Sequence, residues 1–184
     1  MLNIDFLKNN CIKDPWQHGL GFIALYMKDR SIINFHSDLS NHDSKSPHSH
    51  AGNFESTCLF GKLKNIIYDY EEVSKSDWYL MSVTCKEGEK PEVINENIKP
   101  IIISEEIQNE GDVINHFYKN IHDFEILSKY ACTKVIRTTP KMNDPVVIQS
   151  KNVKHVCAYA GKGTAKENWE IIDEILKEQK NVLL

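Results

Sequence analysis

The chain has 184 residues, of which 41% are hydrophobic and 26% are charged, and its net charge is −4. This size and composition are those of one globular domain with a substantial core. The negative net charge, with acidic and basic residues interspersed, argues against nucleic acid as a partner. Five well-separated cysteines without a CxxC pair are typical of reduced thiols in the cytoplasm.

The sequence also argues against secretion and membrane insertion. Its first ten residues, "MLNIDFLKNN", lack the basic and apolar regions of a signal peptide. No apolar run approaches the roughly 18 residues that a membrane-spanning helix requires. We therefore expect a cytoplasmic protein without a membrane partner, folded as a single domain over residues 1–184.

Most of the domain core, about residues 21–160, is predicted to be β-strand. Short segments rich in β-branched and aromatic residues alternate there with turn residues. Residues 21–28 and 31–36 are separated by two residues and predict a hairpin. Residues 111–127 could form a helix, but the Gly-Asp pair at their start and their β-branched content favour two short strands. About ten strands are expected before the first confident helix.

One helix is predicted at the end of the chain, over about residues 164–180. Thr164 and Glu167 have the spacing of a capping box, in which each side chain satisfies a free backbone amide of the other residue. An apolar stripe follows, formed by Trp169, Ile172, Ile175 and Leu176. Many short strands with a single docked helix predict an all-β barrel or sandwich.

Two closely spaced histidines mark a candidate metal site in the stretch "SPHSHAGNFESTCLFG". In an extended strand, residues i and i+2 point to the same side, so His48 and His50 would project together. A turn through residues 51–53 could return Glu55 to the same interior. Two imidazoles and a carboxylate suit zinc, iron, manganese or nickel. The alternative is a polar loop whose histidines bind nothing.

This stretch resembles the first conserved motif of the cupin superfamily: a glycine, five residues, HxH, three or four residues, a glutamate, six residues and a glycine. Here Gly61 falls one residue early, and His42 stands at the leading glycine. Gly111 and His122 have the glycine-to-histidine spacing of the second cupin motif. Three other positions of that motif, normally Pro, Gly and Asn, hold Phe117, Lys119 and Ile126.

The stretch is also similar to small cupins that carry HxHxxDFxS, with Asn53 in place of the aspartate. The resemblance implies an all-β, cupin-type double-stranded β-helix, or jelly-roll barrel, followed by the C-terminal helix. It further implies one divalent metal ion, with Fe(II) favoured and Zn(II), Mn(II) or Ni(II) as alternatives. The implied ligands are His48, His50, Glu55 and His122, and whether Glu55 or Asn53 faces the metal stays open.

The function implied by the resemblance is that of a metal-dependent enzyme acting on a small molecule. Non-haem iron dioxygenases, such as those that resemble cysteine dioxygenase, are the favoured class. The alternative is a non-catalytic cupin that binds a ligand or a protein partner. His122 discriminates between the two, because catalysis becomes improbable if its side chain does not reach the two histidines of the HxH pair. A homodimer is expected only by analogy with other cupins.

Three further residues are candidates for a substrate pocket. His36 ends a predicted strand, and Arg137, on the strand after His122, could bind a substrate carboxylate. His155 could line either a pocket or the core. His116 lies six residues before His122 and would share its side only if the strand were continuous, so we expect it to be a surrounding or surface group.

Overall fold

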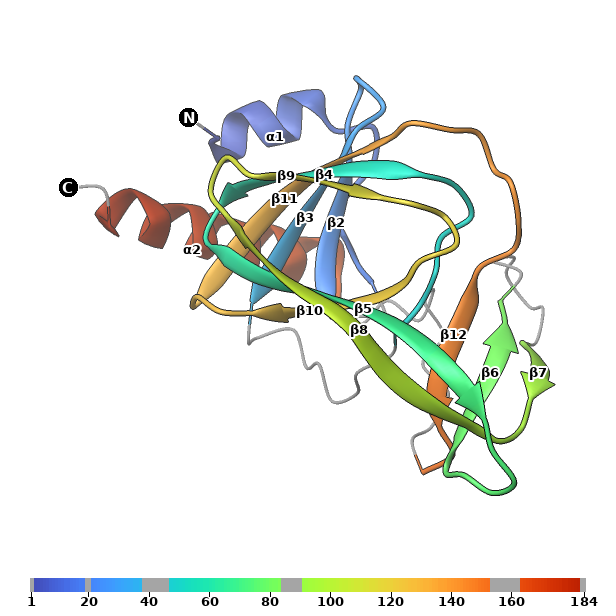
Figure 1. Cartoon of the computed structure of the whole chain (residues 1–184). Coiled ribbons are helices and arrows are strands. Elements are labelled where there is room, and N and C mark those ends of the chain that lie inside the picture. The colour runs from blue at the N-terminus through green and yellow to red at the C-terminus, as the bar shows by residue number, and fades with distance from the viewer. Residues whose placement is uncertain (1, 19–20, 38–46, 84–90, 153–162, 183–184) are drawn as a thin grey trace.

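The computed structural model describes residues 2–18, 21–37, 47–83, 91–152 and 163–182, with side chains described up to residue 179. It consists mostly of antiparallel β-sheet, with a helix near each end of the chain (Figure 1). The all-β class with a C-terminal helix is therefore confirmed.

The elements follow one another in this order: α1 (Ile4–Asn10), β1 (Trp16–Gln17), β2 (Phe22–Tyr26), β3 (Ile32–Ser37), β4 (Phe54–Phe60), β5 (Lys62–Glu72), β6 (Trp78–Ser82), β7 (Glu92–Asn95), β8 (Ile98–Asn109), β9 (Val113–His116), β10 (Ile121–Ile126), β11 (Tyr130–Arg137), β12 (Val146–Ser150) and α2 (Ala165–Val182).

The strands form one large sheet and two small ones. The large sheet has the order β1-β2-β3-β11-β4-β9, and the small sheets have the orders β10-β5-β8 and β12-β6-β7. His48 joins the two small sheets, because its backbone pairs with His122 on one side and with Val147 on the other. The pairing of the described strands does not close the sheets into a barrel.

The large sheet separates an apolar core from a cavity, because successive side chains of a strand point to opposite faces. One face packs against α1 and α2, and its buried residues include Ile23, Leu25, Ile33 and Phe35, with Ile172 and Ile175 of α2. The other face lines the cavity with the intervening residues Phe22, Ala24 and Tyr26 of β2 and Ile32, Asn34 and His36 of β3. The alternation of side chains along β2 and β3 therefore directs one set of residues into the core and the other set into the cavity.

The structure confirms two local predictions. Residues 111–127 form two strands, β9 and β10, rather than one helix. The C-terminal helix begins at Ala165, after a capping box in which the Thr164 N–H donates to Glu167 Oε2 at 2.6 Å and the Glu167 N–H donates to Thr164 Oγ1 at 3.3 Å. Both predictions depended on local side-chain chemistry, which tertiary packing does not override here.

Helix α1 is not among the predicted elements. It spans seven residues, and Asn3 caps it by accepting a hydrogen bond from the Phe6 N–H at 2.8 Å. A helix this short has little intrinsic stability. The packing of Leu7 into the core against α2 stabilises it, and the sequence pattern does not show that contact. Neither helix of the described chain combines the length and apolar character needed to cross a bilayer.

Two glycines with positive φ provide a matched test of this fold. Gly61 (φ +81°) links β4 to β5, and a Cβ there would clash with the Tyr130 carbonyl oxygen and lie 2.7 Å from the Ala131 Cα. Gly111 (φ +87°) has nothing within 4 Å of the corresponding position. We predict that Gly61→Ala lowers the free energy of unfolding by about 3 kcal/mol or more, whereas Gly111→Ala costs about 1 kcal/mol. Urea denaturation measures both, and equal losses would contradict the close packing at Gly61.

Candidate metal centre

Backbone hydrogen bonds position His48 relative to His122. The His48 N–H donates to the His122 carbonyl oxygen and the His122 N–H donates to the His48 carbonyl oxygen, both at 2.9 Å. On its other edge, the segment that carries the HxH pair bonds to β12. The Ser49 N–H donates to the Val146 carbonyl oxygen at 2.8 Å, and the Ser49 Oγ accepts from the Val146 N–H at 2.9 Å. The segment is therefore fixed between β10 and β12.

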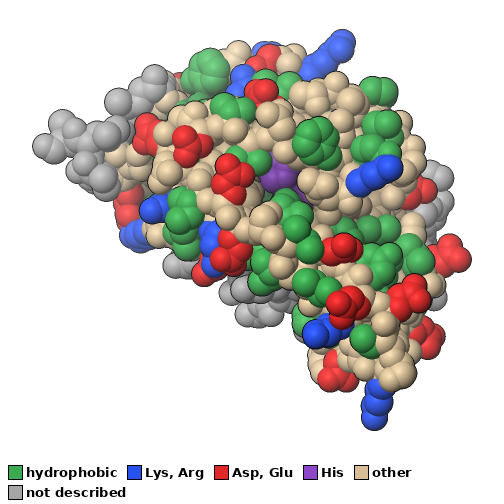
Figure 2. All heavy atoms as spheres, in the orientation of Figure 1, with side chains coloured by type: hydrophobic (Ala, Val, Ile, Leu, Met, Phe, Trp, Pro, Cys, Tyr) green, Lys and Arg blue, Asp and Glu red, His purple; other side chains and the backbone are tan. Residues whose placement is uncertain are grey.

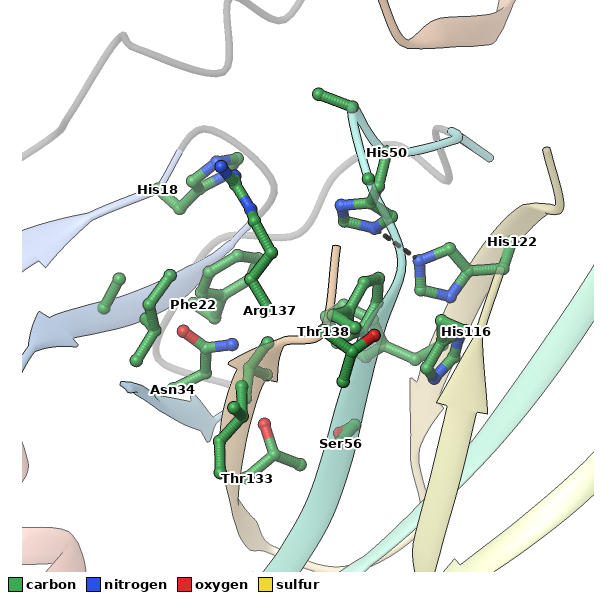
Figure 3. A pocket seen from close by; sticks show the side chains of 18 of the residues that line it. His18, Phe22, Asn34, His50, Ser56, His116, His122, Thr133, Arg137 and Thr138 are labelled. Carbon is green, nitrogen blue, oxygen red and sulfur yellow. Dashed lines mark hydrogen bonds between the residues drawn. The ribbon is translucent and has the colours of Figure 1, made fainter. Parts of the chain in front are cut away.

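The side chains of His48, His50 and His122 converge on one point. Each offers one ligand nitrogen, and these nitrogens all lie within 4.8 Å of one another. The Nε2 atoms of His50 and His122 are 2.7 Å apart (Figure 3), and the three ring centroids are separated by 4.9 to 5.0 Å. In a tetrahedral zinc site, ligand nitrogens are about 3.3 Å apart. The imidazoles are thus close to the spacing that a single metal ion requires.

Aromatic packing holds two of these imidazoles in place. The His116 ring lies 4.4 Å from the His122 ring and stacks on Phe54 at 4.5 Å with an interplanar angle of 9°. Phe54 also meets His50 edge to face at 4.4 Å. Such support from neighbouring side chains restricts the rotamers of metal ligands. His116 is buried and supports the site, and it is not one of the three converging residues.

Burial keeps His50, His116 and His122 neutral. Desolvation is the main cause that lowers the pKa of His50 and of His122 well below the usual value, and the neighbouring charges act in the same direction. Desolvation also lowers the pKa of His116 to about 4. The neutral imidazole is the form that binds a metal. His50 and His122 can therefore bind a divalent metal ion at neutral pH without prior loss of a proton.

The three histidines border a cavity of about 890 Å³, a volume within the range of small-molecule sites. Its wall contains six of the eight histidines of the chain: His18, His36, His48, His50, His116 and His122. The other two, His42 and His155, lie outside the described residues. Figure 2 shows a histidine at the bottom of a hollow in the surface, so the cavity is open to solvent on that face.

Glu55 does not belong to the converging group. Glu55 lies between Phe54 and Ser56 on β4, and both of these neighbours line the cavity, so strand alternation directs Glu55 to the other face. The Asn53 side chain is engaged elsewhere, because its Oδ1 accepts a hydrogen bond from the Tyr118 N–H at 2.8 Å. Among the described residues, the group that could hold a metal is therefore three histidines without a carboxylate.

Two of the three proposed pocket residues line the cavity, and the third cannot be placed. His36 is buried on β3, with its Nε2 3.2 Å from Thr133 Oγ1. Arg137 ends β11 at the exposed side of the cavity. His155 is outside the described residues.

The sequence interpretation missed His18 in the cavity wall. The His18 N–H donates to the Phe22 carbonyl oxygen at 2.7 Å, and the two rings stack at 4.5 Å with an interplanar angle of 10°. Residues paired across antiparallel strands point to the same face, so His18 follows Phe22 into the cavity. The alternation of residues in β2 would have placed His18 in the cavity wall only if the register between β1 and β2 had been known.

Comparison with known proteins gives no assignment. No protein-family model matches the chain, and no curated protein matches its sequence.

The buried histidines predict that metal-free protein loses stability in acid. The pKa of His116 is about 4 in the folded protein and about 6.5 when unfolded, so between these values the unfolded chain binds the proton and the folded chain does not. The stabilisation is complete above pH 6.5 and declines as the pH falls toward 4, by about 1.4 kcal/mol per pH unit for such a residue.

Urea denaturation in the presence of a chelator at pH 7, 6 and 5 measures this decline. His116→Phe should reduce the slope by about one proton, since phenylalanine can keep the stack on Phe54 without titrating. A free energy of unfolding that does not change between pH 7 and 5 would contradict the prediction.

Proposed function

We propose that the chain is a cupin-type jelly-roll protein in which His48, His50 and His122 hold one divalent metal ion. We further propose that it is a non-haem iron dioxygenase-type oxidoreductase acting on a small molecule. The observation that carries this proposal is the position of His122, whose Nε2 lies 2.7 Å from that of His50 although the two residues are 72 positions apart in sequence. A polar loop with adventitious histidines gives no reason for that convergence.

The sheet arrangement supports a cupin relationship. Two of the converging histidines, His48 and His50, come from the segment that joins the small sheets, and His122 comes from β10, while the large sheet supplies the facing wall of the cavity. The glycines of the two sequence motifs, Gly61 and Gly111, both adopt positive φ in turns next to strands. Cupin motifs combine ligand-bearing strands with such turn glycines.

The ligand set bears on the reaction class. Imidazole suits zinc, copper, iron and nickel. Among cupins, three histidines without a strong carboxylate favour iron and a dioxygenase. A bound iron ion would supply open coordination positions and the one-electron chemistry that reaction with dioxygen requires. His48, His50 and His122 would hold the ion, burial keeps His50 and His122 neutral, and the adjoining cavity offers room for a substrate.

Metal content of single variants tests the site. We expect near-stoichiometric metal in the wild-type protein after reconstitution with Fe(II) or Zn(II), and losses of about tenfold or more in affinity for His48→Ala, His50→Ala and His122→Ala. Glu55→Gln is the matched control and should bind as well as wild type, because its side chain faces away from the cavity.

Mass spectrometry of the dialysed proteins gives the metal content, and circular dichroism verifies that each variant is folded. Full metal retention in His122→Ala would refute the three-histidine centre. Loss in Glu55→Gln would mean that the carboxylate is a ligand.

Oxygen consumption tests the reaction class separately. With Fe(II)-loaded protein, we expect uptake of dioxygen on addition of at least one member of a panel of small thiols and carboxylic acids, and no uptake with the His122→Ala variant. If metal binds but no compound supports oxygen uptake, the dioxygenase assignment is wrong and the metal centre stands.

A further inference from the structure

Two uncharged polar side chains lie on the cavity wall away from the candidate metal centre. Asn34 of β3 pairs directly with Thr133 of β11, so both side chains point to the same face of the large sheet. Both residues line the cavity, and Figure 3 shows them across from His50 and His122. We call Asn34 and Thr133 the distal polar pair.

The amide of Asn34 has an unsatisfied hydrogen-bonding group. Its Oδ1 is buried and has no partner among the described residues. A buried polar atom without a partner costs free energy, so such a side chain calls for an explanation. Asn34 alternates with Ile32 and His36 along β3, and all three line the cavity. Rotation of the amide can therefore present its acceptor oxygen or its donor nitrogen to a ligand in the cavity.

Neighbouring side chains hold Thr133 in place. Its Oγ1 lies 3.2 Å from the Nε2 of His36, and the His36 ring meets the Phe124 ring edge to face at 4.7 Å. Such contacts restrict the rotamers of the groups that a ligand meets. The distal polar pair thus joins a fixed hydroxyl to an amide that still has capacity to bind.

The facing wall offers amides at the same depth. Phe124 pairs with Asn65 across β10 and β5, and Asn65 lines the cavity. The buried Asn65 Nδ2 donates to Gln108 Oε1 at 3.2 Å, and Gln108 Nε2 donates to the Ser56 carbonyl oxygen at 2.8 Å. Both walls of this part of the cavity therefore present hydrogen-bonding groups without formal charge.

The charged residues of the cavity lie elsewhere. Among the described residues that line it, Asp29, Arg30 and Arg137 carry formal charges. Arg137 is four residues from Thr133 along β11, a separation of about 13 Å in a strand. Asp29 and Arg30 lie in the turn before β3, at the end of the strand opposite His36. The distal polar pair therefore favours a neutral ligand group, and a hydroxyl, which both donates and accepts, matches the amide in either orientation.

A small molecule can connect the metal centre to the distal polar pair. Phe124 is two residues from His122 along β10, a separation of about 7 Å in a strand, and both residues line the cavity. Phe124 contacts the His36 ring, which in turn reaches Thr133. Ile32 and Val135 line the wall beside the pair, so the intervening surface is largely apolar.

We infer that the substrate of the proposed metal centre carries a neutral hydroxyl group at the end away from the metal, and that Asn34 and Thr133 bind this hydroxyl. The inference rests on the proposed function, because it places the other end of the substrate at the three histidines. The ligand class is a small alcohol with a metal-binding head and an apolar stem. A site built to hydrogen-bond a hydroxyl discriminates strongly against the analogue that lacks it.

Matched thiol probes test this inference without turnover. Protein reconstituted with Co(II) is titrated with ω-mercaptoalkanols, from 2-mercaptoethanol to 6-mercapto-1-hexanol, and with alkanethiols in which a methyl group replaces the hydroxyl. The thiol gives every probe the same metal-binding end, and the thiolate-to-cobalt absorption band reports coordination. The hydroxyl preference is the ratio of the two dissociation constants at one chain length. We expect it to be largest at an intermediate length and small for 2-mercaptoethanol, whose hydroxyl does not reach the distal polar pair.

Isosteric variants identify the groups responsible. At the preferred length, Asn34→Leu should lower the hydroxyl preference about tenfold or more, and Thr133→Val should lower it to a smaller extent. Arg30→Gln changes a cavity residue away from the pair and should keep the preference. All three variants should retain the cobalt content of wild type. If no chain length gives a preference that depends on Asn34, or if Arg30→Gln lowers it as much as Asn34→Leu, the inference is overturned.

Unfolding distinguishes a binding role of Asn34 from a structural one. Leucine is close to asparagine in size, and an apolar group in place of a buried amide without a partner removes a desolvation cost. The urea midpoint of Asn34→Leu should therefore equal or exceed that of wild type. A lower midpoint would show that the amide stabilises the fold and would overturn its assignment to the ligand.

The titrations separate failure of this inference from failure of the metal centre. Absence of cobalt from wild type would refute the proposed function, and this inference with it. Cobalt bound at the three histidines, with alcohols and alkanethiols of every length binding equally, would overturn the inference alone.

Discussion

The reciprocal backbone pairing of His48 with His122 is the constraint on which the site depends. Two hydrogen bonds of 2.9 Å fix the register between the HxH segment and β10. A shift of one residue would direct His122 to the opposite face and separate it from the other two imidazoles. His48 also pairs with Val147, and the two pairings together join the small sheets, so the segment that carries the HxH pair also holds that wall of the fold together.

The large sheet shows how a chain of ordinary composition can accommodate many buried polar groups. Its helix-facing side is apolar and packs with α1 and α2. Its cavity-facing side carries histidine, asparagine and threonine side chains, several of them buried. Buried polar groups without partners cost free energy, and natural proteins accept that cost mainly at functional sites. The polarity of this face is what the proposed metal and substrate sites require of the cavity wall.

Local sequence patterns predicted much of the fold and the two histidines of the HxH pair. The capping box located α2, and alternation placed His48 and His50 on one side. The orientation of Glu55 could not be predicted from spacing alone. It depends on the turn after His50, which determines which face of β4 lies on the same side as the His48 and His50 side chains. Placing His18 in the cavity wall required the register between β1 and β2. His122 was identified through its resemblance to a family motif, because contacts over 72 residues leave no periodic signal.

X-ray absorption at the metal edge of the reconstituted full-length protein tests the central claim most directly. Three imidazoles holding one ion predict a first shell dominated by nitrogen or oxygen at about 2.0 to 2.2 Å, with the outer-shell scattering of about three imidazole rings. Sulfur at about 2.3 Å would assign the metal to cysteines instead. A first shell without imidazole scattering would equally contradict a centre formed by His48, His50 and His122.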